Sequence, residues 1–106
     1  MLYQIEHYQN QAKKTPFVEW LVVLQNIQAK NCILRRINRL QLGNFGDCKP
    51  CRNGVWELRI DIGPGYRIYY ARSGKQIIVL LCAGDKKSQS ADISRACDYW
   101  RDWQEG

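Results

Sequence analysis

The sequence predicts a single α+β domain with elements in the order β-α-α-β-β-β-α, a mainly antiparallel sheet and helices packed on one sheet face. The chain has 106 residues, a length that suits one domain with one hydrophobic core. Apolar residues recur at helical spacing between residues 16 and 42, whereas residues 56–83 alternate as strands do. We therefore treat residues 1–106 as one domain.

The first half of the chain predicts one strand and two helices. Residues 2–8 alternate in polarity and predict a short strand. Thr15 as N-cap and Pro16 as the first helical residue predict the start of an amphipathic helix. A second helix is expected over residues 27–42, with Gly43 closing it.

The second half predicts a meander of three strands and a last helix. Turn-forming residues fill positions 44–53. The three strands are expected at residues 56–62, 66–72 and 75–83. The last strand is apolar on both faces, which indicates a central place in the sheet. The closing helix is expected to begin near residues 88–90.

The predicted hairpin has one polar face. Alternation along the strands places Glu57, Arg59, Arg67 and Tyr69 on it, and we expect this face to point away from the helices. A three-residue connection would pair Arg59 with Tyr69 and Asp61 with Arg67. Guanidinium groups bind phosphate bidentately and stay charged, and a neighbouring tyrosine can stack on a base. Ordinary surface salt bridges between the same strands are the alternative.

Positive charge is concentrated in one part of the chain. The formal net charge is +6, and residues 30–75 contain ten basic and three acidic side chains. Arg35 and Arg39 lie on the side of the second predicted helix opposite its apolar stripe. One basic zone is typical of a protein that binds a polyanion, and nucleic acid is the leading candidate. A solvated basic surface without a partner is the alternative.

Composition argues for a soluble cytoplasmic location. No apolar run approaches the ~18 residues of a membrane-spanning helix, so we expect no membrane partner. The N-terminal residues lack the basic and apolar regions of a secretory signal. An odd number of cysteines, five, in a chain able to fold by burial alone predicts free thiols.

Two loops carry charged or reactive groups. The loop before the last helix contains Lys86, Lys87 and Gln89, and backbone amides at a helix start together with two ammonium groups suit a phosphate. Cys48 and Cys51 form a CxxC pair, but no second pair has the spacing of a zinc site. We expect neither a metal site nor a cofactor.

Four segments follow a known pattern in order and spacing. They are PFVEWL (16–21), RINRLQLGNFGDCK (36–49), GVWELRIDIGPGYRIYYA (54–71) and LLCAGDKKSQSADISRA (80–96). These segments resemble the RelE/ParE superfamily of type II toxins and, within it, look most like the HigB-like branch of addiction-module killer proteins. The resemblance covers nearly the whole chain.

This resemblance implies a ribosome-dependent mRNA endoribonuclease that arrests translation. It implies a cognate antitoxin as partner, a small helix-turn-helix protein, with operator DNA contacted only through that antitoxin. Carried over by position, the family's strand residues match Arg59 and Arg67. Its loop after the last strand matches Lys86 or Lys87, and Lys49 matches a common family lysine more loosely.

The groups for proton transfer match less well. The family's C-terminal Tyr or His has no counterpart, because Asp92 and Ile93 stand near its place. Glu57 is the candidate general base, and Tyr69 the candidate for positioning or proton transfer. A ParE-like toxin that inhibits DNA gyrase without cutting RNA is the alternative function, and a non-toxic RNA-binding module is a third.

Overall fold

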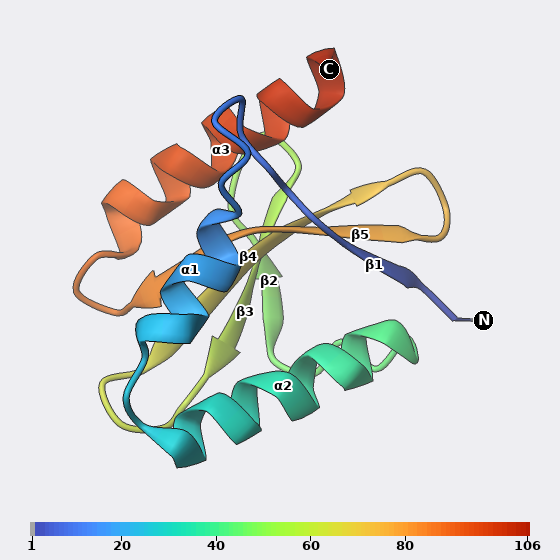
Figure 1. The fold of residues 1–106 in the computed structure, drawn as a ribbon. Coiled ribbons are helices and arrows are strands. Elements are labelled where there is room, and N and C mark those ends of the chain that lie inside the picture. The colour runs from blue at the N-terminus through green and yellow to red at the C-terminus, as the bar shows by residue number, and fades with distance from the viewer. Residues whose placement is uncertain (1) are drawn as a thin grey trace.

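The computed structural model describes residues 2–106 as a five-stranded sheet between helices (Figure 1). The elements are β1 (Gln4–His7), α1 (Pro16–Val23), α2 (Ile27–Gln41), β2 (Cys48–Pro50), β3 (Val55–Ile60), β4 (Tyr66–Ser73), β5 (Ile77–Asp85) and α3 (Gln89–Glu105). The strand order is β1-β5-β4-β3-β2, with β1 parallel to β5 and all other pairs antiparallel. The predicted α+β class and the mainly antiparallel sheet are confirmed.

The helices cover both sheet faces, so the expectation of helices on one face is wrong. In Figure 1 the strands lie between α3 above and α2 below. Phe17 of α1 and Ile33 of α2 belong to the core on one face, whereas Ala96 of α3 belongs to a second core on the other. The physical reason lies in β5, whose buried residues alternate between the two cores, Leu80 in the first and Val79 in the second. A strand that is apolar on both faces needs cover on both.

A short strand, β2, lies in the segment that the sequence predicts to be turn. Lys49 pairs with Glu57 and Pro50 with Trp56, which places β2 at the sheet edge beside β3. Proline has no N–H to donate, so it is tolerated in a sheet chiefly on an edge strand. The order is therefore β-α-α-β-β-β-β-α, one strand more than predicted.

The connection between β3 and β4 is longer than expected. Arg59 pairs with Arg67 and Glu57 with Tyr69, so the predicted Arg59–Tyr69 and Asp61–Arg67 pairs are wrong by two positions. Residues 61–65 form the connection, and Gly65 within it has a φ of 82°. A shift of two preserves the alternation of side chains. Glu57, Arg59, Arg67 and Tyr69 therefore still share one face.

The helix α2 begins and ends close to the predicted residues 27 and 42, and α3 begins within the predicted residues 88–90. The side chain of Asn26 accepts a hydrogen bond of 3.0 Å from the Ala29 amide and so caps α2. Gly43, at a φ of 87°, follows the end of α2. Among residues 2–106, none of the helices combines the length and the apolar character needed to cross a bilayer.

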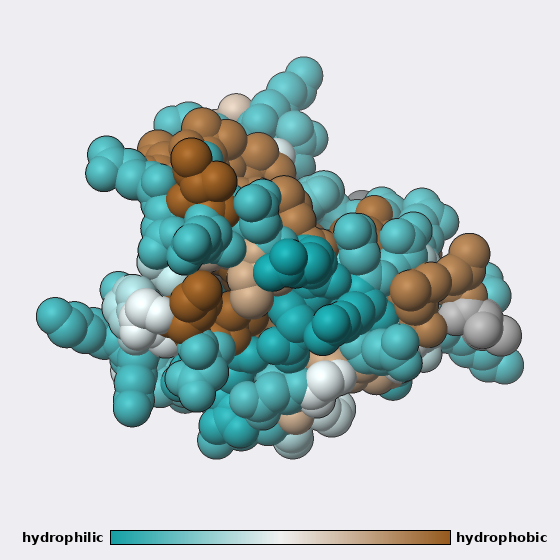
Figure 2. All heavy atoms as spheres, turned by 90° about the horizontal axis from the view of Figure 1, so that it is seen from below, coloured by the Kyte–Doolittle hydropathy of each residue, from teal (hydrophilic) through white to brown (hydrophobic). Residues whose placement is uncertain are grey.

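Hydrophilic side chains dominate the side of the molecule on which α2 lies (Figure 2). Apolar side chains form separate areas on that view. The most exposed large apolar residues of α1, α2 and the segments that flank them are Val22, Val23, Ile27, Leu34 and Leu42.

Candidate functional site

Arg67 and Lys86 lie close together at one corner of the sheet, where β3 and β4 join and β5 ends, and Arg59 lies on the neighbouring strand. Arg59 and Arg67 lie directly opposite each other on β3 and β4, and Arg67 also pairs with Gly84 of β5. Lys86 follows β5. A Cβ at Gly65 would lie 3.8 Å from Lys86 Cβ and 4.0 Å from Arg67 Nη1, so both side chains border the same point. Of the cations that the sequence singled out, the structure thus places Arg67 and Lys86 beside each other and Arg59 opposite Arg67 on β3.

Arg59 is already paired with a carboxylate. Its Nη2 and Nε donate to Asp47 Oδ1 at 2.8 and 3.2 Å. Hydrogen bonding to Asp47 raises the pKa of the Arg59 guanidinium. The Arg59 side chain is 37% exposed, so an incoming anion can reach it but must compete with Asp47.

Glu57 is a buried carboxylate at the centre of the polar face, with no exposed surface. Gln89 Nε2 donates to Glu57 Oε2 at 2.6 Å, and the Tyr69 hydroxyl donates to the same oxygen at 3.4 Å. Arg67 Nε lies 4.0 Å from Glu57 Oε1. The first turn of α3 therefore covers this part of the face, and the expectation of an open face is wrong.

Burial changes what these groups can do. Tyr69 is fully buried, and desolvation followed by the charge of Glu57 raises the pKa of its phenol. Tyr69 therefore stays neutral and cannot stack on a base from solution. Glu57 cannot reach a substrate 2′-hydroxyl while Gln89 covers it. In this arrangement Glu57 places a negative charge beside the Arg67 guanidinium, and Tyr69 orients Glu57 through its hydrogen bond.

Two amides of the loop that leads into α3 are already bound to a carboxylate. Asp85 Oδ1 accepts hydrogen bonds from the Lys87 and Ser88 amides at 2.9 and 3.2 Å. Gln89, predicted to bind phosphate, points to Glu57 instead. The exposed side chains of Lys86 and Lys87 are what this loop presents to solvent.

A second buried carboxylate, Asp92, ties α3 to the end of β5. It is 2% exposed and accepts hydrogen bonds from the Ser88 hydroxyl and from Arg95. A Cβ at Gly84 would come within 1.8 Å of Asp92 Oδ2, so only glycine allows this approach. The residue nearest the family's C-terminal Tyr or His position therefore faces inward.

The other predicted phosphate-binding residues lie further away. Lys49 is exposed and pairs with Glu57 across the strands β2 and β3, so it borders the site at the sheet edge. Arg35 and Arg39 are exposed on α2, which packs on the opposite sheet face. The structure does not bring these two arginines to the corner of Arg67.

Three carboxylate contacts were not predicted from the sequence. Asp47 accepts hydrogen bonds from Arg59, Asp85 accepts them from the amides of the loop, and Asp92 lies close to the backbone of Gly84. Each joins segments whose closeness depends on the path of the chain in space. The glycine that follows the apolar run of β5 is the one local signal, because a close backbone approach favours glycine.

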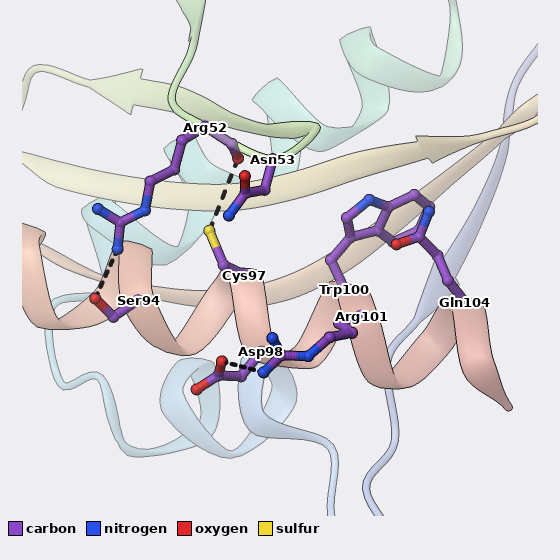
Figure 3. A pocket seen from close by; sticks show the side chains of 8 residues that line it. All are labelled: Arg52, Asn53, Ser94, Cys97, Asp98, Trp100, Arg101 and Gln104. Atoms are coloured by element: carbon purple, nitrogen blue, oxygen red, sulfur yellow. Dashed lines mark hydrogen bonds and ion pairs between the residues drawn. The ribbon is translucent and has the colours of Figure 1, made fainter.

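The pocket between the turn after β2 and α3 is separate from this corner (Figure 3). It measures about 410 Å³, and none of the predicted site residues lines it. Its charged groups are already paired, Arg52 with Ser94 at 2.8 Å and Arg101 with Asp98 at 2.8 Å. Residues 2–106 also contain no group of three His, Cys, Asp or Glu side chains placed to hold a metal ion.

Comparison with known proteins identifies the family. Residues 19–96 match the family described as "Phage derived protein Gp49-like (DUF891)". The chain belongs to this family. Gp49-like proteins are toxins of toxin–antitoxin modules and are related to RelE and ParE, which agrees with the resemblance seen in the sequence. The narrower HigB-like assignment stays a prediction.

One curated relative of this Gp49-like protein is an uncharacterized protein of Haemophilus influenzae (strain ATCC 51907 / DSM 11121 / KW20 / Rd). The two are 50% identical over 80 residues, which make up 76% of this chain and 81% of the relative. The match covers most of both proteins.

Proposed function

We propose that this Gp49-like protein is a toxin that cleaves mRNA on the ribosome and so arrests translation in the cytoplasm. The observation that supports this proposal is the corner of the sheet that carries Arg67 and Lys86, with Arg59 opposite Arg67 on β3. Arginines near the ends of paired strands, one of them beside a buried carboxylate, form a rigid cationic surface that fits a scissile phosphate.

The chemistry follows from where charge develops. Attack of the 2′-hydroxyl on the phosphate creates a pentacoordinate species with added negative charge, and cations already in place stabilise it more than they stabilise the ground state. Arg67 would bind a phosphate oxygen, with Arg59 and Lys86 adding charge at its sides. As the bond from the 2′-oxygen to phosphorus forms, the 2′-hydroxyl gives its proton to water. The bond to the 5′-oxygen breaks and that oxygen takes up a proton from water, which leaves a 2′,3′-cyclic phosphate and a 5′-hydroxyl end.

Proton transfer is the weaker part of this site. Glu57 and Tyr69 are buried, so the corner supplies charge and positioning rather than a general base at its surface. We therefore propose that cleavage depends on the ribosome, which holds the mRNA in a geometry suited to in-line attack. Free RNA should be cut much more slowly.

We propose a cognate antitoxin as the partner of this chain. The membership of the chain in the Gp49-like family supports such a partner. We propose that it is a small helix-turn-helix protein encoded beside the toxin, and that operator DNA is contacted only through it. Sequencing the neighbouring reading frame tests this part of the proposal.

Primer extension on a translated message after induced expression tests the activity. Stops at defined codon positions support an mRNA endoribonuclease. Intact messages with double-strand DNA breaks would instead show a ParE-like inhibitor of gyrase and refute the proposal. Intact messages, intact DNA and unimpaired growth would indicate an RNA-binding module and would refute it too.

A further inference from the structure

A small aromatic pocket lies on the sheet face that carries α2, opposite the face of Arg67. Its walls are Phe45, Gly46, Cys48, Trp56, Tyr70 and Arg72. Its volume is about 170 Å³. An apolar cavity of about 150 Å³ in another protein holds one benzene molecule, so this pocket has room for a single aromatic ring.

The lining of the pocket is mainly aromatic and offers few polar groups. The Cys48 thiol is already used, because its Sγ donates to the Phe45 carbonyl at 2.9 Å. A nucleobase would bring a polar edge with several groups to bind, and leaving them unpaired in such a lining is costly. A hydrocarbon ring has no such edge. The lining therefore favours a phenylalanine-like side chain over a base.

The rim of the pocket is positively charged. The Arg72 guanidinium stacks over the Phe45 ring at 4.5 Å and donates to the Tyr3 hydroxyl at 2.8 Å. Arg36 adds charge from inside the fold: its Nη2 is buried behind Gly46, 2.8 Å from where a Cβ would lie, and among residues 2–106 it has no hydrogen-bond partner.

The surroundings add to this charge. Along α2 the basic residues are Lys30, Arg35, Arg36 and Arg39, and this helix contains no acidic residue. A symmetric dimer pairs identical surfaces, so the cations of one copy would lie opposite the same cations of the other copy and repel them. An acidic partner is the complementary one.

We propose that this pocket receives one aromatic side chain from an acidic segment of the antitoxin, with a neighbouring carboxylate bound by Arg72. The proposal rests on the toxin–antitoxin assignment and not on RNA cleavage. The pocket would act as the central anchor of the interface, with the basic side of α2 as its surroundings.

The test uses an end-blocked tripeptide, glutamate–phenylalanine–glutamate, as the probe, titrated into the full chain labelled with ¹⁵N. We expect saturable shifts of the Trp56 indole and of the Gly46 amide in the NMR spectrum. Arg72→Ala should weaken binding about tenfold, since a hydrogen bond to a charged group is lost. Arg101→Ala, which removes another exposed arginine, on α3, should bind as the wild type does.

Two further peptides and a nucleotide separate the outcomes. The peptides lysine–phenylalanine–lysine and glutamate–alanine–glutamate should each bind at least about tenfold more weakly. No saturation by the first peptide at about ten millimolar would refute the proposal. Equal shifts with uridine 5′-monophosphate would refute it in favour of a nucleotide site, and shifts that follow the chain's own concentration would refute it in favour of a dimer.

Failure of this test and failure of the nuclease proposal can be told apart. The titration contains no RNA and no ribosome, so it reports on the pocket alone. Primer extension, in turn, reports on cleavage without any antitoxin segment. Arg72→Lys keeps the charge and should bind the peptide almost as well as the wild type. Weak binding by Arg72→Ala alone would then be due to the lost charge and not to a loss of fold.

Discussion

Glu57 Oε1 lies 4.0 Å from Arg67 Nε, and neither buried atom has a hydrogen-bond partner of its own among residues 2–106. The two charges therefore face each other without a direct bond. Gln89 and Tyr69 bind the other carboxylate oxygen of Glu57 and orient it. This places a fixed negative charge behind Arg67, whose side chain is 12% exposed. The guanidinium is thereby presented to solvent as a positioned cation.

Glu57→Ala should destabilise the protein by about 3 kcal/mol or more, because it leaves the guanidinium of Arg67 partly buried and unpaired. Urea unfolding measures the change in the free energy of unfolding. Asp98→Ala is the matched control: it breaks the Arg101–Asp98 pair, whose side chains are 68% and 66% exposed. Loss of such a surface pair should cost less than about 1 kcal/mol. Equal effects of the two substitutions would contradict the role given to Glu57.

Arg67→Ala should reduce mRNA cleavage in a translating extract by about 100-fold to 1,000-fold, the range for loss of one group that stabilises transition-state charge. Arg59→Ala should have a smaller effect, since Asp47 already neutralises Arg59 in the free protein. Primer extension on a defined message quantifies the cuts, and Arg101→Ala serves as the control. Undiminished cleavage by Arg67→Ala would remove this residue from the mechanism.

Local patterns predicted most of the fold. Helical spacing placed α1 and α2, and alternation placed β3, β4 and β5, because these elements bury apolar residues at regular intervals. The strand β2 was missed because residues 48–50 have no apolar alternation and are ordered by pairing with β3. Cover on both faces was missed although β5 is apolar on both of them. Which helix covers which face depends on contacts far apart in the chain.

Only part of the candidate site was predicted, because some of its features depend on contacts between residues far apart in the chain. Strand alternation correctly grouped Arg59 and Arg67 with Glu57 and Tyr69, because side chains alternate whatever the register. The burial of Glu57 and Tyr69 depends on where α3 crosses the sheet, and no local pattern reports that crossing. The position of Gln89 over Glu57 is likewise a consequence of tertiary structure.

Gly84→Ala should destabilise the fold strongly, by more than about 3 kcal/mol, because its Cβ would come within 1.8 Å of Asp92 Oδ2. Either β5 or the first turn of α3 has to move. Gly74→Ala is the control: no atom of residues 2–106 lies within 4 Å of a Cβ at this position, and its φ of 68° is what opposes the substitution. That strain should cost about 1 kcal/mol. Thermal unfolding followed by circular dichroism compares the two, and similar melting temperatures would contradict the close approach.

Tyr8 should make stability fall as the pH rises through the alkaline range. Its hydroxyl donates to Asp102 Oδ2 at 2.6 Å, and burial, followed by this hydrogen bond, raises its pKa from 10.0 to about 12. Between these values the unfolded chain releases the phenol proton whereas the folded chain keeps it, so the free energy of unfolding decreases with pH. This contribution is fully present below pH ~10, the unfolded value, and is lost as the pH rises through about 12.

Tyr8→Phe isolates this contribution, because the other buried tyrosines and cysteines titrate alike in both proteins. At neutral pH the wild type should be the more stable by about 1–3 kcal/mol, the value of a hydrogen bond to a charged acceptor. The difference in the free energy of unfolding should shrink as the pH rises above about 10, since only the wild type has a Tyr8 phenol to ionise. Guanidinium unfolding at a series of pH values measures it. A difference that stays constant up to pH ~11 would mean that Tyr8 titrates alike in the folded and unfolded states, and that Asp102 does not stabilise its protonated form.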